Sequence, residues 1–172
     1  KVKINDDGEI LIKGENVMLG YWNNPLETSK SIKDGWLFTG DIGQFDNGFL
    51  RITDRKKDIL ITPGGDNISP VKIENDLLKI EFIDQALVYG DNKPFLVALL
   101  ILSNDKKNVS TTTIRDAVEK INNKLTKIEK IKKFIVIDKQ FSIENGFMTP
   151  TLKLKRYKII QVYKKELEKL YN

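Results

Sequence analysis

The sequence predicts an α+β fold, with a small mixed or antiparallel sheet of about three strands, flanking helices and a short hairpin. Two observations lead to this fold class. Patterns typical of strands and of helices follow one another without regular alternation, and segment 95–103 is apolar throughout, as a central strand is. Strand patterns dominate the first 55 residues, so we expect one domain over 1–55 and a second over 56–172.

In the first part of the chain, strands are expected at 8–14, 42–45 and 49–53. Asn24 precedes Pro25 as an N-cap residue precedes a first-turn proline, which predicts a short helix over 23–32. The tripeptide Asp-Asn-Gly at 46–48 separates the last two strands. Because Asn and Gly tolerate positive φ angles, this tripeptide predicts a hairpin.

In the second part, strands are expected at 58–61, 67–69, 84–91, 95–103 and 133–138. The pair Ser69-Pro70 predicts the start of an amphipathic helix of about ten residues. Two further helices are predicted over 111–125 and 154–171. Their apolar faces are formed by Ile114, Val118, Ile121 and Leu125 in the first and by Ile159, Tyr163, Leu167 and Leu170 in the second.

The composition excludes several kinds of site. The 172 residues include no cysteine and no histidine, which rules out disulfides and thiolate catalysis and removes the commonest general base and metal ligand. Chemistry must rest on Lys, Arg, Asp and Glu, and we expect no metal site. No apolar run approaches the roughly 20 residues that cross a bilayer. Residues 1–10 lack a signal-peptide pattern and an initiator Met, so we expect a soluble piece of a longer protein.

The net charge of +5 suits an anionic partner, such as a nucleotide, coenzyme phosphates, nucleic acid or a membrane surface. The lysines are scattered along amphipathic segments and do not cluster with aromatic residues, which favours a solvated surface. We therefore expect no nucleic-acid partner.

Segment 54–58 places five charges in five consecutive residues, DRKKD. Arg55 carries a planar fork that suits phosphate or ribose oxygens, and its alternative role is a surface ion pair with Asp54 or Asp58. We expect the charges of this segment to be solvated.

Three other positions are candidates for chemistry. Asp41, expected at the start of a strand, can accept two hydrogen bonds from vicinal sugar hydroxyls or satisfy backbone N–H groups in a turn. The pair Gly64-Gly65 can let a ligand approach the backbone or simply form a tight turn. Lys153 lies before the last helix, and a lysine on a loop can neutralise charge in phosphoryl or acyl transfer.

Four ordered motifs cover nearly the whole chain: GEILIKGENVMLGYWNNPLETSKSI (8–32), DGWLFTGDIGQFDNGFLRITDRKKDIL (34–60), PGGDNISPVKIEN (63–75) and ENGFMTPTLKLKR (144–156). Together they resemble the later motifs of the adenylate-forming acyl-CoA synthetase superfamily, the AMP-binding enzymes. The second and fourth are most similar to the long-chain fatty acid–CoA ligase branch. The resemblance implies that 1–55 is the β-rich end of the N-terminal domain and that 56–172 is the mobile C-terminal domain.

The resemblance also implies roles for individual residues. Asp41, in Thr-Gly-Asp, would bind the ribose hydroxyls of ATP and of the acyl-adenylate, and Arg55 would contact the ribose and a nearby phosphate. Lys57 would be the hinge about which the C-terminal domain turns between two catalytic poses. Lys153 would contact the carboxylate and the α-phosphate during adenylation, where it offsets negative charge.

The implied chemistry has two steps. A fatty carboxylate attacks the α-phosphate of Mg-ATP to give acyl-adenylate and pyrophosphate, and the thiol of CoA then displaces AMP. Gly64 or Gly65 would face the pantetheine of CoA in the second step. ATP, Mg²⁺ and CoA would be bound mainly with the protein's own N-terminal domain, so the isolated chain, which lacks the phosphate loop, is expected to be inactive. We further expect a cytoplasmic enzyme with peripheral membrane association.

Two positions depart from the superfamily pattern, and two alternatives stay open. Thr151-Leu152 precedes Lys153 where most members have Ser-Gly, and Lys72 stands where many have Glu. The first alternative is a ligase of the same superfamily that acts on medium-chain or aryl acids, or transfers the acyl group to a carrier protein. The second is a non-catalytic basic module that binds nucleic acid or a membrane.

Overall fold

The computed structural model describes residues 1–172 and divides them into two compact units, Lys1–Ile59 and Leu60–Asn172. Each unit is described by itself. The division lies a few residues beyond the boundary expected near residue 55. The 3₁₀ helix η1 (Lys56–Asp58) therefore belongs to the first unit, where Lys56 bonds to Glu9.

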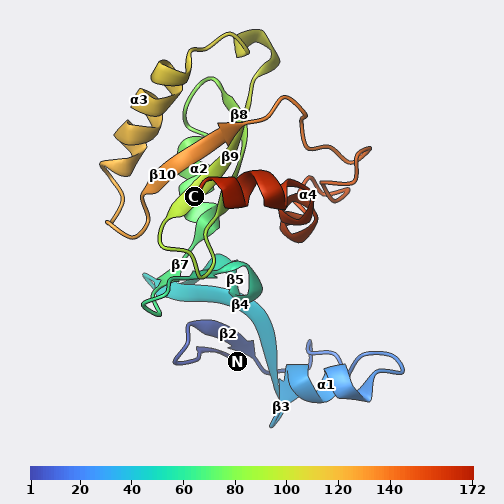
Figure 1. Ribbon diagram of the computed structural model, residues 1–172. Helices are drawn as coiled ribbons and strands as arrows, with labels where there is room; N and C mark the ends of the chain where they lie inside the picture. The colour runs from blue at the N-terminus through green and yellow to red at the C-terminus, as the bar shows by residue number, and fades with distance from the viewer. The chain divides into compact units, whose positions relative to one another are not determined.

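The first unit is an antiparallel sheet with one short helix (Figure 1). Its strands are β1 (Val2–Ile4), β2 (Glu9–Ile12), β3 (Ile32–Lys33), β4 (Trp36–Asp46) and β5 (Phe49–Arg55). Four strands follow the order β1-β2-β4-β3, and β5 pairs with β4. The helix α1 (Pro25–Ser31) lies between β2 and β3 in the chain.

Helix α1 and the β4–β5 hairpin form where the sequence predicts them. The side chain of Asn24 accepts a hydrogen bond from the backbone N–H of Glu27 at 3.1 Å, which caps the helix. In the hairpin turn, Asn47 and Gly48 have φ angles of 49° and 84°. Strand β4 is longer than predicted, so Asp41 lies inside a strand and not at the start of one.

The second unit is built on a mixed three-stranded sheet. Strand β9 (Leu96–Leu102) is central, antiparallel to β8 (Ile83–Tyr89) and parallel to β10 (Ile131–Val136). Strands β6 (Leu60–Ile61) and β7 (Asn67–Ile68) form a separate short hairpin. Every residue of β9 is buried, which confirms the central strand predicted from its apolar sequence.

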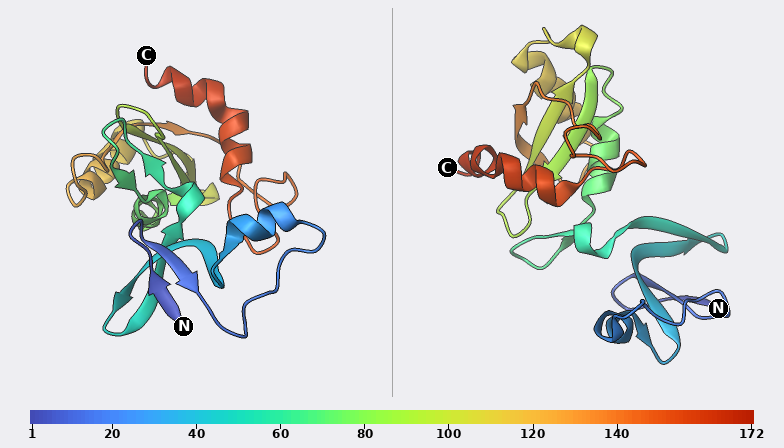
Figure 2. Two further views of the ribbon diagram at one scale, coloured as in Figure 1. Left: turned by 90° about the horizontal axis from the view of Figure 1, so that it is seen from below. Right: turned by 90° about the vertical axis from the view of Figure 1, so that its right-hand side faces the viewer.

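Helices cover both faces of this sheet. They are α2 (Pro70–Leu77), α3 (Thr111–Asn122) and α4 (Arg156–Lys169), and the 3₁₀ helix η2 (Asn104–Lys106) follows β9. Alternate residues of β9 point to opposite faces, so Ala98 and Leu100 join one apolar cluster and Val97 and Leu99 the other. Helices α2 and α3 pack in the first cluster and α4 in the second, on different sides of the sheet (Figure 2). The α+β fold class is confirmed.

The apolar helix faces predicted from the sequence are the faces that pack. The predicted face of α3 and Leu125 lie in the first cluster, and the predicted face of α4 and Leu170 lie in the second. The hydroxyl of Ser69 caps α2 by accepting from the N–H of Lys72 at 3.2 Å. None of the helices combines the length and the apolar content that crossing a membrane requires.

Candidate functional site

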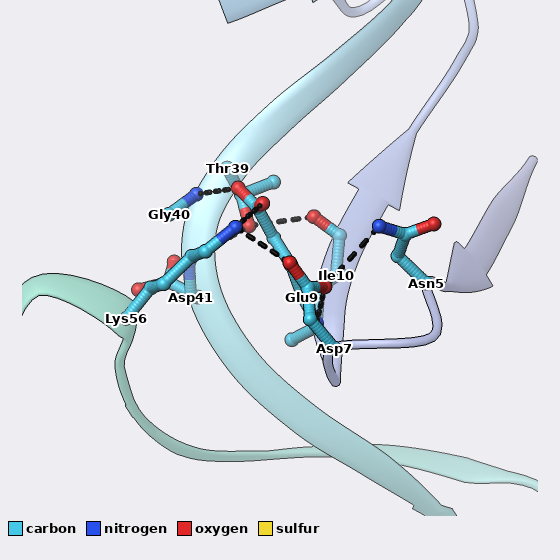
Figure 3. A network of polar contacts seen from close by, with 8 residues as sticks. All are labelled: Asn5, Asp7, Glu9, Ile10, Thr39, Gly40, Asp41 and Lys56. Carbon is cyan, nitrogen blue, oxygen red and sulfur yellow. Dashed lines mark hydrogen bonds and ion pairs between the residues drawn. The ribbon is translucent and has the colours of Figure 1, made fainter. Parts of the chain in front are cut away.

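The Thr-Gly-Asp motif forms a bend within β4. Gly40 has a φ of 70°, a left-handed conformation that favours glycine. The hydroxyl of Thr39 donates to the carbonyl oxygen of Ile10 at 2.8 Å and accepts from the N–H of Asp41 at 3.1 Å. The first of these bonds ties β4 to β2 (Figure 3). These bonds fix the direction of the backbone at Asp41.

A buried carboxylate supports the same bend. Glu9 is only 4% exposed, and its Oε1 accepts from the N–H of Gly40 at 2.8 Å while its Oε2 accepts from the ammonium of Lys56 at 2.8 Å. Lys56 also contacts Asp7 at 2.7 Å (Figure 3). The hydrogen bonds to Asp7 and to Glu9 raise the pKa of Lys56 above its ordinary 10.5. The hydrogen bond from Lys56 lowers the pKa of Asp7 below its ordinary 3.8.

Glu9 and Lys56 are not among the site residues predicted from the sequence. They are far apart in the chain, and no local pattern pairs them. The available signal was weak: Glu9 begins a strand whose next residues, Ile10 and Leu11, are both buried. A charged residue in such a position needs a partner to be buried.

The two residues predicted to bind the nucleotide face each other across β4 and β5. The Nε of Arg55 lies 2.8 Å from Oδ1 of Asp41. The side chain of Asp41 is 20% exposed and that of Arg55 is 53% exposed, so both can meet a ligand. The alternative ion pair of Arg55 with Asp54 or Asp58 is wrong, because Asp41 is the partner.

Asp54 is buried, unlike the other charged residues of segment 54–58. It is 7% exposed, and its Oδ1 accepts from the N–H of Arg55 at 2.9 Å. Its Oδ2 is buried without a hydrogen-bond partner. The expectation that these charges are all solvated is therefore wrong at Asp54. The register of β4 and β5 shifts between Ile42 and Gly43 beside it, and such a bulge re-aims side chains.

An open cavity of about 660 Å³ in the first unit is lined by Arg55 and by Thr39 and Gly40 of the Thr-Gly-Asp motif. Five cationic side chains line it against two carboxylates: Lys30, Lys33, Arg55, Lys56 and Lys57 against Glu9 and Glu27. Two aromatic rings, those of Tyr21 and Phe38, also line it. Cations with flat apolar surface suit an anion that carries a ring, which is the chemistry of a nucleotide.

The glycine pair lies in the tight loop between β6 and β7. The N–H of Gly65 donates to the carbonyl oxygen of Thr62 at 2.9 Å, and the hydroxyl of Thr62 accepts from the N–H of Asp66 at 3.0 Å. Gly65 has a φ of 88°, whereas Gly64 is not in the left-handed region. The turn alone therefore requires a glycine at Gly65 only.

Lys153 lies in a narrow hairpin before α4. Met148 and Leu154 form an antiparallel bridge, and the turn between them is closed by a hydrogen bond of 2.9 Å from the N–H of Leu152 to the carbonyl oxygen of Thr149. Lys153 is exposed, and its ammonium makes no hydrogen bond or ion pair within the chain. Leu152 has a φ of 60°. Most members of the resembled superfamily have glycine there, which suits this conformation better.

The predicted site residues fall into two groups. Asp41, Arg55 and Lys57 lie in the first unit, where Asp41 and Arg55 are in direct contact and Arg55 and Lys57 line one cavity. The glycine pair and Lys153 lie in the second unit, in two separate loops. The structure thus joins the residues predicted to bind the nucleotide, within one unit.

Two curated proteins are similar to the chain over nearly all of its length. The first is the long-chain-fatty-acid–CoA ligase FadD15 of Mycobacterium tuberculosis, 36% identical over 99% of this chain and 32% of that protein. The second is the long-chain-fatty-acid–CoA ligase 5 of Mus musculus, 35% identical over 98% of this chain and 28% of that protein. The chain thus spans about a third of the length of these relatives.

Two solved structures have the same fold. The A domain of the carboxylic acid reductase from Segniliparus rugosus, in complex with AMP and a co-purified carboxylic acid, superposes with a TM-score of 0.86 at 26% identity, over 95% of this chain and 28% of that one. The O-succinylbenzoate coenzyme A synthetase from Bacillus subtilis, in complex with AMP, gives a TM-score of 0.73 at 34% identity. The match covers 92% of this chain and 33% of that one.

A family model matches residues 57–172, and its description is AMP-binding enzyme C-terminal domain. This range covers more than half of the chain and the whole of the three-stranded sheet with its helices. The chain therefore belongs to the AMP-binding enzymes, with residues 57–172 as their C-terminal domain.

Proposed function

We propose that the chain is the C-terminal part of a long-chain fatty acid–CoA ligase, which forms acyl-adenylate from a fatty acid and ATP and then acyl-CoA with release of AMP. The main support for the proposal is sequence identity: the chain is 36% and 35% identical, over nearly its whole length, to two long-chain-fatty-acid–CoA ligases. The activity belongs to the full-length protein, of which the chain supplies the residues discussed below.

Asp41 and Arg55 are the proposed contacts to the ribose of the nucleotide. Arg55 engages Oδ1 of Asp41, which orients the carboxylate and leaves Oδ2 to accept from a ribose hydroxyl. The cationic cavity beside them supports this assignment. No group of three or more metal-ligating side chains occurs in residues 1–172, so we assign no residue of this chain to the Mg²⁺ that accompanies ATP.

Lys153 is the proposed catalytic residue of adenylation. In that step the fatty carboxylate attacks the α-phosphorus of ATP, the new acyl–phosphate bond forms, and pyrophosphate leaves with the electrons of the broken bond. Two anions must approach each other, and a positive charge between them lowers the barrier. The exposed ammonium of Lys153, without a partner in the chain, is suited to this role.

Lys57 is the proposed hinge between the two catalytic poses. It is exposed and lies in the single turn of η1, and short 3₁₀ segments are weakly held. The preceding residue, Lys56, is fixed to Asp7 and Glu9. Hinges are loop or element-terminal residues that absorb a change in φ and ψ, and Lys57 follows directly after this anchored residue.

Gly64 is the proposed contact to the pantetheine of CoA. Gly65 is explained by its φ of 88°, but Gly64 has no such requirement. A Cβ at Gly64 would meet only side-chain oxygens, those of Asp66 at 3.4 Å and Thr62 at 3.6 Å. A glycine that the turn does not need is consistent with close approach of a ligand.

The experiment is a product assay on the full-length protein with ATP, CoA and a series of acids. We expect AMP release and thioester formation with long-chain fatty acids. A preference for medium-chain or aryl acids, or transfer to a carrier protein in place of CoA, would contradict the proposed substrate but not the family. Co-sedimentation with lipid vesicles would test the proposed peripheral membrane association of a cytoplasmic enzyme.

A second candidate function within the family has one observation in its favour. The A domain of a carboxylic acid reductase has a TM-score of 0.86 to this chain, above the 0.73 of the coenzyme A synthetase. Its identity is only 26%, however, against 36% for the long-chain ligase. The assay with and without CoA separates the two candidates.

A further inference from the structure

The backbone of Lys153 is held by a single residue, Thr149. The N–H of Thr149 donates to the carbonyl oxygen of Lys153 at 2.8 Å, and the hydroxyl oxygen of Thr149 accepts from the N–H of Lys153 at 3.0 Å. Both polar groups of the Lys153 backbone are therefore bonded to Thr149. One of these bonds needs the threonine side chain, and the other does not.

The base of this hairpin is attached to the apolar core. The N–H of Lys155 donates to the carbonyl oxygen of Phe147 at 2.8 Å. Phe147 is 5% exposed and packs in the second cluster, with its ring 5.5 Å from that of Phe141 between centroids. The hairpin thus projects from a fixed base, and only its tip, 149–153, depends on local hydrogen bonds.

The chain is anchored again directly after the hairpin. The guanidinium of Arg156 donates to both carboxylate oxygens of Glu74, at 2.6 and 2.8 Å, and to the carbonyl oxygen of Val88 at 2.8 Å. The side chains of Arg156 and Glu74 are 12% and 8% exposed. The buried ion pair with Glu74 fixes the first turn of α4 to α2, and the bond to Val88 fixes it to β8. Lys153 therefore lies between two anchors, while its ammonium stays without a partner.

We propose that Thr149 is a positioning residue for Lys153: its hydroxyl fixes the backbone from which the ammonium reaches the reacting carboxylate and phosphate. The proposal rests on the proposed function of Lys153 in adenylation. Loss of the hydroxyl leaves the N–H of Lys153 without its acceptor and lets the hairpin tip shift. A displacement of about 1 Å at a reacting group can lower a rate by about 100-fold.

The test measures the two half-reactions separately in the full-length ligase: acyl-adenylate formation from fatty acid and ATP, and thioester formation from supplied acyl-adenylate and CoA. Thr149→Val keeps the shape of the side chain but removes the acceptor. We expect it to lower the first rate by about 10- to 100-fold and to leave the second within about twofold, because Lys153 acts only in the first. Thr149→Ser keeps the hydroxyl and should restore the first rate.

The matched control is Thr151→Val, which deletes a hydroxyl of the same turn. The hydroxyl of Thr151 lies 3.0 Å from that of Thr149 but makes no bond to the backbone of Lys153. We expect normal rates in both half-reactions. A loss in Thr151→Val equal to that in Thr149→Val would assign the effect to the turn in general and overturn the proposal.

Lys153→Ala, measured in parallel, separates this proposal from the proposed function. If Lys153→Ala loses adenylation selectively and Thr149→Val does not, the positioning role of Thr149 is wrong and the role of Lys153 stands. If Lys153→Ala lowers both half-reactions equally, the role of Lys153 is wrong and the positioning role falls with it. Failure of serine to restore the rate would also overturn the role of the Thr149 hydroxyl.

Discussion

Each of the two units is stabilised internally, and the interactions that stabilise them differ. In the second unit, two apolar clusters cover both faces of the three-stranded sheet. In the first unit, the buried apolar side chains are Ile10 and Leu11, and several large apolar side chains are exposed, among them Leu19 at 103%, Trp22 at 92% and Phe49 at 79%. The second unit has a core of its own, and the first has almost none.

The two candidate sites accordingly obtain their geometry from different interactions. The bend at Asp41 is held by hydrogen bonds and ion pairs, through Thr39, Glu9 and Lys56. Lys153 is held by a hairpin whose base, Phe147, is part of an apolar cluster. We therefore expect the first unit to be sensitive to charge and pH, and the second to be sensitive to the volume of buried side chains.

The largest effect on stability is expected in the core of the second unit. Leu99 is fully buried at the centre of β9. Leu99→Ala should lower the free energy of unfolding by about 2–5 kcal/mol, because it removes apolar contacts and leaves a cavity. Chemical denaturation measures this. The matched control is Leu26→Ala in α1, where Leu26 is 74% exposed and the change should stay within about 0.5 kcal/mol. Equal losses at the two sites would contradict the contrast between the units.

The next effect concerns the polar network of the first unit. Lys56→Met removes the cation from Glu9, which is 4% exposed. We expect a loss of roughly 1–3 kcal/mol, smaller than for a fully buried pair because the side chain of Lys56 is 48% exposed. The control is Lys30→Met, which breaks an exposed pair with Glu27 and should change stability by less than about 0.5 kcal/mol. An unchanged free energy of unfolding in Lys56→Met would show that the network does not stabilise this unit.

The same network predicts an acid-dependent loss of stability. The folded pKa of Asp7 lies below its ordinary 3.8, so the stabilisation is present above pH 3.8 and is lost as the pH falls through the lowered value. The pKa of Lys56 is raised above 10.5, so its contribution is present below that pH and is lost only as the pH rises through the raised value. Unfolding measured against pH should show a shallower acid decline in Lys56→Met than in the natural chain. Identical acid profiles would contradict the assignment.

The smallest effect is expected at Leu152. Its φ of 60° is unfavourable for a leucine and tolerable for an asparagine, and its side chain is 67% exposed, so little packing is lost. Leu152→Asn should raise the free energy of unfolding by about 0.5–1 kcal/mol. A thermal melt measures the change. Leu152→Val, with a β-branched side chain at the same angle, should lower stability, and a gain in that variant would count against backbone strain at this position.

Local patterns in the sequence predicted most of the fold. The cap at Asn24, the turn at 46–48, the apolar strand β9 and the apolar faces of α3 and α4 were all predicted, because each depends on residues close together in the chain. Residue chemistry singled out Asp41, Arg55, the glycine pair and Lys153, and the resemblance gave their roles and added Lys57. The structure shows the contact between Asp41 and Arg55.

The pairs that hold the sites were not predicted. Lys56 and Glu9 are 47 residues apart, and Arg156 and Glu74 are 82 apart. Charged residues are common throughout this chain, and no periodicity says which of them pair across such distances. The buried Asp54 was missed for a similar reason, since the bulge that turns it inward depends on the register of two strands.

The claim that the chain serves adenylation through Lys153 and thioester formation through a pivot at Lys57 is tested most directly by comparing two variants of the full-length protein in both half-reactions. Lys153→Ala should lower acyl-adenylate formation by orders of magnitude and leave thioester formation from supplied acyl-adenylate largely intact. Lys57→Pro should do the reverse, because proline fixes φ and removes the N–H at the hinge. Equal losses in both half-reactions for either variant would contradict the claim.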